Sequence, residues 1–408
     1  MSFHELPISA TLISSLPAEI QTAKEIQKRT IPVMMDNQDI LALAQTGSGK
    51  TLAYGLPLIE KAMRRRFAEQ AIVLVPTREL ATQISNELSS ISQQIDVQVI
   101  TLCGGIEIEQ QITLLANNPA IIVATPGRLL ELLKQNLINV QQVKSLVLDE
   151  VDRLLDMGFW PDLTAIISQL PAINQTALFS ATMPEALQEK ANSLLSDPVQ
   201  IQVHAINSVV EQIKERLYLV NKGNKAKVLI HQIKQHQWQQ VLVFISTREN
   251  ADALSKKLNK AGISCAALHG NKSQQQRDET LDLFKQHKLM VIIATDVLAR
   301  GLHIERLPVV VNFDLPANPE TYVHRIGRTA RMGEEGLAVS LVCHNENQQL
   351  DSIRQFTKRE LKLDQLEQFP VTDKPSCGES ARRPRDKQAN RRTNNKKSIK
   401  AFKTNKQR

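Results

Sequence analysis

The sequence predicts two α/β domains in tandem, each built on a parallel sheet. A basic tail follows the second domain. Short, nearly continuous runs of β-branched and aliphatic residues alternate with longer amphipathic stretches, and this alternation recurs in both halves of the chain. Strands that are apolar throughout and separated by helices are typical of a parallel sheet covered on both faces. A length of 408 residues also favours two or three domains over one.

The first half contains six apolar runs that we expect to be strands. They lie at 39–45, 71–76, 97–102, 120–126, 145–150 and 176–182, with helical patterns between them, such as 78–91 and 127–134. Each run is bounded by polar or turn-forming residues, as strands of this length usually are.

The second half repeats the pattern. Strands are expected at 240–246, 290–295, 309–314 and 337–342, and helices at 250–261 and 273–286. A polar stretch at 205–212, after a short strand read in VQIQV, predicts the joint. The expected organisation is an N-terminal segment at 1–28, a first domain at 29–206, a second at 213–370 and a disordered basic tail at 371–408.

Composition excludes several classes of protein. No apolar run approaches the 18 or more residues that span a bilayer, and the N-terminus lacks the pattern of a signal peptide. The four cysteines are far apart and form no CxxC pair, which argues against a disulfide framework or a zinc site. We therefore expect reduced thiols, a cytoplasmic location and no membrane partner.

The positive charge is concentrated in the tail. Residues 371–408 hold 13 Lys or Arg and 3 Asp or Glu, a net charge of +10, although the whole chain carries only +8. Such a basic segment, almost without aliphatic residues, is typical of a flexible arm that binds a polyanion such as RNA. The alternative is an inert solubilising tail.

A glycine-rich segment has the pattern of a phosphate-binding loop. It follows a predicted strand, opens a predicted helix and comprises Ala44, Gln45, Thr46, Gly47, Ser48, Gly49, Lys50 and Thr51. Gly47 and Gly49 let backbone N–H groups approach phosphate oxygens, Lys50 suits the β- and γ-phosphates, and the Thr51 hydroxyl suits Mg²⁺. The alternative is a glycine-rich turn before a helix.

Two adjacent carboxylates end the apolar strand at 145–150. The carboxyl ends of parallel strands are where α/β proteins bind ligands. Asp149 suits an outer or water-bridged contact to Mg²⁺, and Glu150 suits orienting and deprotonating an attacking water. Without a phosphate loop in the same domain, a solvated acidic strand end would be the better interpretation.

An ordered set of motifs goes beyond a general nucleotide-binding protein. The set comprises Pro76–Leu80, Gly104–Gly105, Thr125–Arg128, Asp149–Asp152, Ser180–Thr182, Ala294–Asp296, Ala299–Gly301 and His324–Arg331. In order and spacing it resembles the DEAD-box RNA helicases of superfamily two, in their bacterial form, from Phe3 to about residue 360. This resemblance implies two tandem RecA-like domains and an RNA-dependent ATPase that uses ATP and Mg²⁺. It implies local separation of short RNA duplexes or remodelling of RNA–protein complexes by a monomer, with ribosomal or RNA-decay proteins as further partners.

The resemblance also implies roles for single residues. Gln27 would read the adenine edge, while Phe3 would either pack on the base or staple the first helix. Arg325 and Arg328 would reach the γ-phosphate from the second domain, and Asp152, Ser180 and Thr182 would couple the ATP site to domain closure. RNA would lie along Pro76, Thr77, Arg78, Gly105, Thr125, Pro126, Gly127 and Arg128 of the first domain, and along Thr247, Arg277 and Thr295 of the second. Asp296 would lie near that path and would contribute to nucleotide binding.

Three positions depart from the family pattern. Val151 replaces the alanine of the DEAD motif, and its extra methyl groups must fit against neighbouring turns. His303 stands where an aspartate normally meets the ribose, so weakened nucleotide closure with some pH sensitivity is expected. Lys24 stands where a threonine is expected to contact the phosphate loop, which puts fine ATP sensing in doubt.

Two other functions remain open at this point. A DNA helicase or translocase of the same superfamily would be stimulated by DNA as well as by RNA. An ATP-gated RNA clamp would hydrolyse ATP with RNA but would separate no strands.

Overall fold

The computed structural model describes residues 2–44, 47–64, 69–170, 173–203, 213–296, 307–329 and 336–373. Gln45, Thr46, His303 and Arg331 lie outside this part of the chain, as do segment 299–301, the whole of the predicted joint at 205–212 and the tail beyond residue 373.

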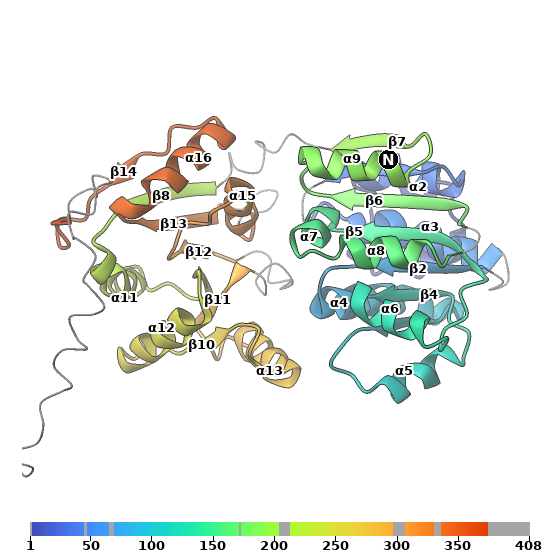
Figure 1. Ribbon diagram of the computed structural model, residues 1–408, viewed down its shortest axis with the longest axis horizontal. Coiled ribbons are helices and arrows are strands. Elements are labelled where there is room, and N and C mark those ends of the chain that lie inside the picture. Colours follow the sequence, from blue (N-terminus) through green and yellow to red (C-terminus); the bar gives the residue numbers. More distant parts are fainter. Residues whose placement is uncertain are drawn as a thin grey trace, which may run out of the picture. The chain divides into compact units, whose positions relative to one another are not determined.

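Two seven-stranded sheets, both entirely parallel, form the framework of the described residues (Figure 1). The first contains β1 (Ile40–Ala44), β2 (Gln70–Leu74), β3 (Val99–Leu102), β4 (Ile121–Ala124), β5 (Val143–Asp149), β6 (Gln175–Ser180) and β7 (Val199–Val203). The second contains β8 (Ile213–Leu219), β9 (Val241–Phe244), β10 (Cys265–Leu268), β11 (Val291–Ala294), β12 (Val309–Asn312), β13 (Gly336–Val342) and β14 (Leu363–Asp364).

The two sheets share one topology. The order is β3-β4-β2-β5-β6-β1-β7 in the first and β10-β11-β9-β12-β13-β8-β14 in the second, so the n-th strand of each domain takes the same place. The predicted tandem of parallel α/β domains is thereby confirmed. In each sheet the chain leaves two neighbouring strands in opposite directions along the sheet. Open α/β sheets bind their ligands at the carboxyl ends of the strands beside such a point.

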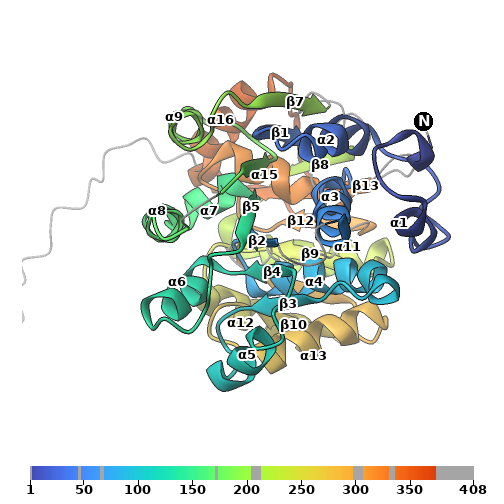
Figure 2. The same ribbon diagram turned by 90° about the vertical axis from the view of Figure 1, so that its right-hand side faces the viewer.

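Helices cover both faces of the first sheet, as Figure 2 shows. One layer comprises α1 (Ala10–Ser14), α2 (Glu25–Met35), α3 (Lys50–Arg64) and α4 (Arg78–Ser92); the other comprises α5 (Ile108–Leu115), α6 (Pro126–Lys134), α7 (Val151–Asp156), α8 (Trp160–Ile167) and α9 (Glu185–Leu194). Successive residues of a strand point to opposite faces. Accordingly Ala42 packs with the first layer, whereas Leu41 packs with the second.

The second sheet is covered in the same way. Helices α11 (Lys225–Gln235) and α12 (Arg248–Lys260) lie on one face, and α13 (Gln274–Lys285), α15 (Pro319–Ile326) and α16 (Asn347–Thr357) pack against the other. Four short 3-10 helices complete the described elements: η1 (Phe3–Glu5), η2 (Gln93–Ile95), η3 (Lys222–Asn224) and η4 (His344–Glu346).

Three strands of the second sheet escaped prediction, and β8 shows why. Its sequence carries Lys214, Glu215 and Arg216 in succession, so it lacks the apolar run of its neighbours. Glu215 accepts a hydrogen bond of 2.6 Å from the Tyr322 hydroxyl and pairs with Arg359. The Glu215 charge makes the sequence of this strand resemble that of a loop, and in the fold Tyr322 and Arg359 compensate that charge. Strands β10 and β14 are short, with four and two residues.

The thiols agree with the expectation of unpaired cysteines. In the described part of the chain Cys103, Cys265 and Cys343 are all free and buried. Burial raises the pKa of each thiol, that of Cys343 to about 12, so the reactive thiolate is suppressed. Among the described residues, none of the helices combines the length and the hydropathy of a membrane span.

Candidate functional site

The predicted phosphate loop joins the end of β1 to the start of α3. Gly47 and Gly49 have φ angles of +79° and +92°, in the left-handed region that a side chain disfavours. A Cβ atom on Gly49 would lie 2.6 Å from Gln27 Nε2, so the close approach of α2 also requires glycine there. Ala44 ends β1, Ser48 lies between the two glycines, and Lys50 and Thr51 begin α3.

Lys50 and Asp149 form the charged centre of the first domain. The Lys50 ammonium lies 3.8 Å from Asp149 Oδ1, and both side chains are buried. The Tyr54 hydroxyl, one helical turn after Lys50, donates a 3.0 Å hydrogen bond to Asp149 Oδ2. Burial raises the pKa of Asp149, and the charge of Lys50 opposes this shift. The phosphate loop and the strand-end carboxylate therefore meet, as the sequence predicts for a site that binds phosphate and Mg²⁺.

Glu150 occupies a strained position between β5 and α7. Its φ and ψ are +53° and +50°, left-handed values that cost a residue with a side chain roughly 1–3 kcal/mol. The Glu150 N–H donates to Asp149 Oδ1 at 2.8 Å, and its carboxylate pairs with Arg153. Both contacts fix the turn, and strain of this kind is characteristic of functional sites.

Asp152 connects the end of β5 to the end of β6. Its Oδ2 accepts hydrogen bonds of 3.0 Å from both the backbone N–H and the hydroxyl of Thr182. The Ser180 hydroxyl donates to the Thr182 carbonyl at 2.7 Å, and Ser180 pairs with Leu43 of β1 in the sheet. The three predicted coupling residues thus form one buried network beside the phosphate loop.

The N-terminal segment reaches the phosphate loop through two side chains. Gln27 donates to the Gly49 carbonyl at 3.1 Å and accepts from the Lys24 N–H at 2.8 Å. Lys24 Nζ donates to the Gly47 carbonyl at 3.2 Å. Phe3 is only 2% exposed and belongs to the core of the first domain, which favours the packing interpretation over contact with a base.

The candidate RNA-contacting residues of the first domain gather at the carboxyl ends of β2, β3 and β4. These strands are neighbours in the sheet. Thr77 caps α4 by accepting from the Leu80 N–H at 3.3 Å. A Cβ atom on Gly105 would lie 2.3 Å from Arg78 Nη1, so the missing side chain makes room for that guanidinium.

Arg128 holds the next loop in place. It donates to the Ile106 carbonyl at 3.1 Å and pairs with Glu131 at 3.0 Å. The rest of this group lies alongside: Pro76 is buried before α4, and Thr125, Pro126 and Gly127 form the start of α6. The sheet edge that carries the phosphate loop therefore also carries these loops.

In the second domain the candidates follow β9 and β11 and begin α13. Thr247 is exposed and caps α12, accepting from the Asn250 N–H at 3.2 Å. Thr295 and Asp296 follow β11 directly. Arg277 donates through Nε to the Lys272 carbonyl at 3.2 Å. Because β11, β9 and β10 are adjacent, these residues also cluster at one sheet edge.

Arg325 is the most extensively bound arginine of this edge. It contacts Asp296 in a two-pronged ion pair, with Nε–Oδ1 at 2.6 Å and Nη2–Oδ2 at 2.8 Å. Its Nη1 donates to Asn312 Oδ1 at 3.0 Å and to the Asp314 carbonyl at 2.6 Å. The guanidinium also lies 4.9 Å from the centre of the Phe244 ring. All four of these hydrogen bonds are made within the second domain. Arg328, just beyond α15, is also buried, with 3% of its surface exposed.

Several of these partners were absent from the sequence-based prediction. Asn312 and Asp314 end the apolar run at 309–314, so the rule that selected Asp149 would also have selected them. Tyr54 lies four residues after Lys50, on the same face of the helix. Val151, the departure in the DEAD motif, is completely buried in the core with Leu154, so its methyl groups are accommodated there.

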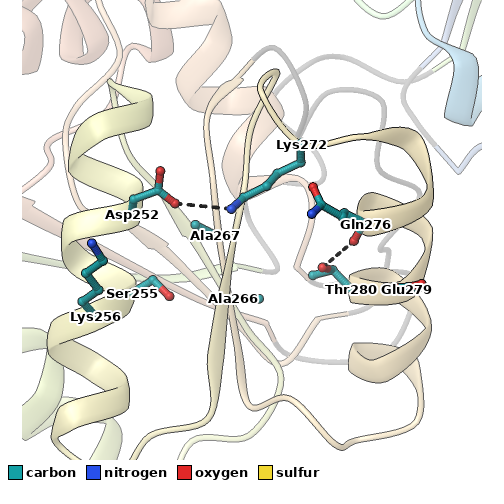
Figure 3. A pocket seen from close by; sticks show the side chains of 9 residues that line it. All are labelled: Asp252, Ser255, Lys256, Ala266, Ala267, Lys272, Gln276, Glu279 and Thr280. Carbon is teal, nitrogen blue, oxygen red and sulfur yellow. Dashed lines mark hydrogen bonds and ion pairs between the residues drawn. The ribbon is translucent and has the colours of Figure 1, made fainter. Parts of the chain in front are cut away.

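A separate cavity of about 360 Å³ lies in the second domain, between α12, β10 and α13 (Figure 3). The Lys272 ammonium lies 3.6 Å from Asp252 Oδ1 at its wall, and Thr280 donates to the Gln276 carbonyl at 2.7 Å. None of its lining residues belongs to the predicted nucleotide or RNA sites.

Family models match both domains. The DEAD/DEAH box helicase model matches residues 24–190, and the model of the helicase conserved C-terminal domain matches residues 224–333.

Curated relatives and solved structures agree with these matches. The chain is 39% identical over 379 residues to the DEAD-box ATP-dependent RNA helicase CshA of Bacillus cereus, covering 93% of this chain and 72% of the relative. Identity to the protein of the same name from Bacillus subtilis is 38% over 380 residues, covering 93% and 76%. The structure of S. cerevisiae Dbp5 bound to RNA and ADP BeF3 superposes with a TM-score of 0.82 at 31% identity, covering 89% of this chain and 95% of that one. The fold is therefore a tandem of RecA-like domains, and the chain belongs to the DEAD/DEAH box helicase family.

Proposed function

We propose that the chain is an ATP-dependent RNA helicase that uses ATP binding and hydrolysis to separate short RNA duplexes or to remodel RNA–protein complexes. The observation that carries this proposal is the shared sheet edge of the first domain. The phosphate loop with the Lys50–Asp149 pair lies at one half of that edge, and the glycine- and arginine-containing loops lie at the other. Nucleotide and RNA would therefore contact the same rigid sheet.

The first domain would bind ATP and Mg²⁺ through residues 44–51 and Asp149. The glycine cradle fits a phosphate, because Gly47 and Gly49 adopt left-handed φ angles at the N-terminus of α3, where backbone amides commonly bind anions. Mg²⁺ needs only one or two protein oxygen ligands beside phosphate oxygens and water, which Asp149 and the Thr51 hydroxyl supply. Bound Mg²⁺ would neutralise charge on the transferred phosphoryl group.

Glu150 would position and deprotonate the attacking water, and its fixed backbone would hold the carboxylate in place. From the second domain, Arg328 would neutralise charge on the terminal phosphate. Arg325 is bound to Asp296, Asn312 and the Asp314 carbonyl, so it would have to give up these contacts to act there. We propose that it instead holds the edge of the second domain on which Thr295 and Asp296 lie.

The RNA path would consist mainly of hydroxyl groups, backbone amides and arginines. Contacts of this kind reach phosphate and sugar and carry no sequence information. Contacts to the 2′-hydroxyl would favour RNA over DNA. We further propose a cytoplasmic monomer that acts with ribosomal or RNA-decay proteins; the free, buried cysteines of the described chain support a reducing compartment.

The deciding experiment compares ATP turnover without nucleic acid, with single-stranded RNA and with DNA of the same sequence. RNA is expected to raise the rate at least tenfold while DNA leaves it near the basal level, and a short RNA duplex should be separated in the presence of ATP. Equal stimulation by DNA would favour a DNA helicase or translocase. RNA-stimulated hydrolysis without strand separation would favour the clamp.

The basic tail gives a separate prediction. Truncation after Pro370 should weaken RNA binding and flatten its salt dependence, because each lost phosphate contact on a single strand lowers the slope of log K against log salt by about 0.7. The measurement is RNA binding at several salt concentrations. A matched variant with Arg382, Arg383 and Arg385 changed to Gln should show part of the effect. Unchanged RNA affinity after truncation would show that the tail is inert.

A further inference from the structure

Lys24 places an extra ammonium group on the phosphate loop. Its Nζ donates to the Gly47 carbonyl at 3.2 Å, although the residue lies on the N-terminal segment 23 positions before that glycine. Its side-chain stem crosses the loop as well, since a Cβ atom on Gly49 would lie 3.1 Å from Lys24 Cδ. Lys24 therefore covers both glycines of the cradle.

The backbone around Lys24 holds it in this position independently of its side chain. The Lys24 N–H donates to Gln27 Oε1 at 2.8 Å, and Gln27 in turn donates to the Gly49 carbonyl at 3.1 Å. Substitution of the Lys24 side chain leaves this frame intact. The side chain itself is exposed, so replacing it removes a charge without opening a cavity.

We propose that Lys24 is a nucleotide-binding residue whose positive charge strengthens the hold of the loop on the polyphosphate. This inference rests on the proposed function of the loop. Where the family pattern has a threonine, a neutral hydroxyl would supply only a hydrogen bond, whereas the ammonium, held at the Gly47 carbonyl, would add a positive charge to the loop that binds the phosphates. Lys50 is buried beneath the loop, and Lys24 is a second cation on its outer side.

The size of the effect follows from Coulomb attraction close to water. Two charges a few ångströms apart near a protein surface attract by about 1 kcal/mol or more, equivalent to about a fivefold change in affinity. ATP carries one more negative charge than ADP, so the gain should be larger for ATP. Because Lys24 is exposed, salt should screen the attraction: the Debye length falls from about 10 Å at 0.1 M to about 3 Å at 1 M.

The test is direct nucleotide binding by the full-length chain, measured with a fluorescent ADP and by its displacement with ATP. Lys24→Gln is expected to weaken ATP binding about fivefold at 0.1 M salt and less than twofold at 1 M. The effect on ADP should be smaller at both concentrations. Lys24→Arg keeps the charge and should retain affinity within twofold.

Lys28→Gln is the matched control. Lys28 lies one turn further along α2 and pairs with Glu25 at 3.8 Å, so this variant removes the same charge from the same helix, away from the loop. It should bind both nucleotides like the wild type.

Three outcomes would overturn the inference. Wild-type affinity in Lys24→Gln would show that the ammonium contributes nothing. A loss that is independent of salt, or equal for ATP and ADP, would reduce Lys24 to a hydrogen-bonding support of the loop. A wild-type chain that binds neither nucleotide would refute the proposed function together with this inference, whereas the first two outcomes leave that function intact.

Discussion

Replacing Glu150 with glutamine is expected to lower ATP turnover in the presence of RNA by about 10²–10⁴-fold, the usual contribution of a positioned general base. Glutamine has the same shape but accepts no proton. Because the loop, Lys50 and Asp149 remain, ATP binding should change little. The measurement is the rate of phosphate release at saturating RNA and ATP, accompanied by ATP binding and thermal unfolding of the same protein.

Asp156→Asn is a suitable control for this variant. Asp156 is an exposed carboxylate at the end of α7, the helix that begins directly after Glu150, so it tests loss of a negative charge nearby without changing the strand end. Its ATP turnover should match the wild type. Retention of more than a third of wild-type turnover by Glu150→Gln would contradict the assigned role of Glu150.

Replacing Arg325 with methionine is expected to destabilise the second domain by roughly 1–3 kcal/mol, the usual cost of leaving a buried hydrogen-bonding group such as the Asn312 side chain without its partner. The change leaves the Asp296 carboxylate, the Asn312 side chain and the Asp314 carbonyl without their shared donor. The measurement is urea unfolding followed by tryptophan fluorescence.

The two tryptophans of the sequence allow this domain to be observed separately. Trp160 lies in α8 of the first domain, and Trp238 is buried in the second. A Trp160→Phe background leaves Trp238 as the reporter. In that background, Arg325→Met should clearly lower the free energy of unfolding. Arg248→Met, which removes an exposed contact to Asn271, should change this free energy by no more than about 0.5 kcal/mol.

A double substitution tests whether the ion pair is the cause. Arg325→Met combined with Asp296→Asn should be less destabilised than the sum of the two single variants, because neither the buried guanidinium nor the partly exposed carboxylate is left without its partner. Strict additivity, or a single variant as stable as the wild type, would show that Arg325 is not the organising group of this edge.

The architecture was largely readable in the sequence, because apolar strands buried on both faces have a signature independent of their distant partners. The glycine-rich loop and the Asp149–Glu150 pair could also be predicted from the sequence, because a few consecutive residues at a strand end set their geometry. Strand β8 was missed because its charged residues are compensated by Tyr322 and Arg359, more than a hundred residues away.

Local patterns could not assign long-range partners. Arg325 and Arg328 are equivalent in the motif, yet tertiary packing binds Arg325 to Asp296, Asn312 and the Asp314 carbonyl. Lys24 looked like the loss of a sensing threonine, whereas in the fold its long side chain reaches the Gly47 carbonyl. Residue order along the chain therefore predicts which groups carry the chemistry, and the packing of strands and helices selects their partners, because hydrogen bonds and ion pairs depend on distances that sequence separation does not encode.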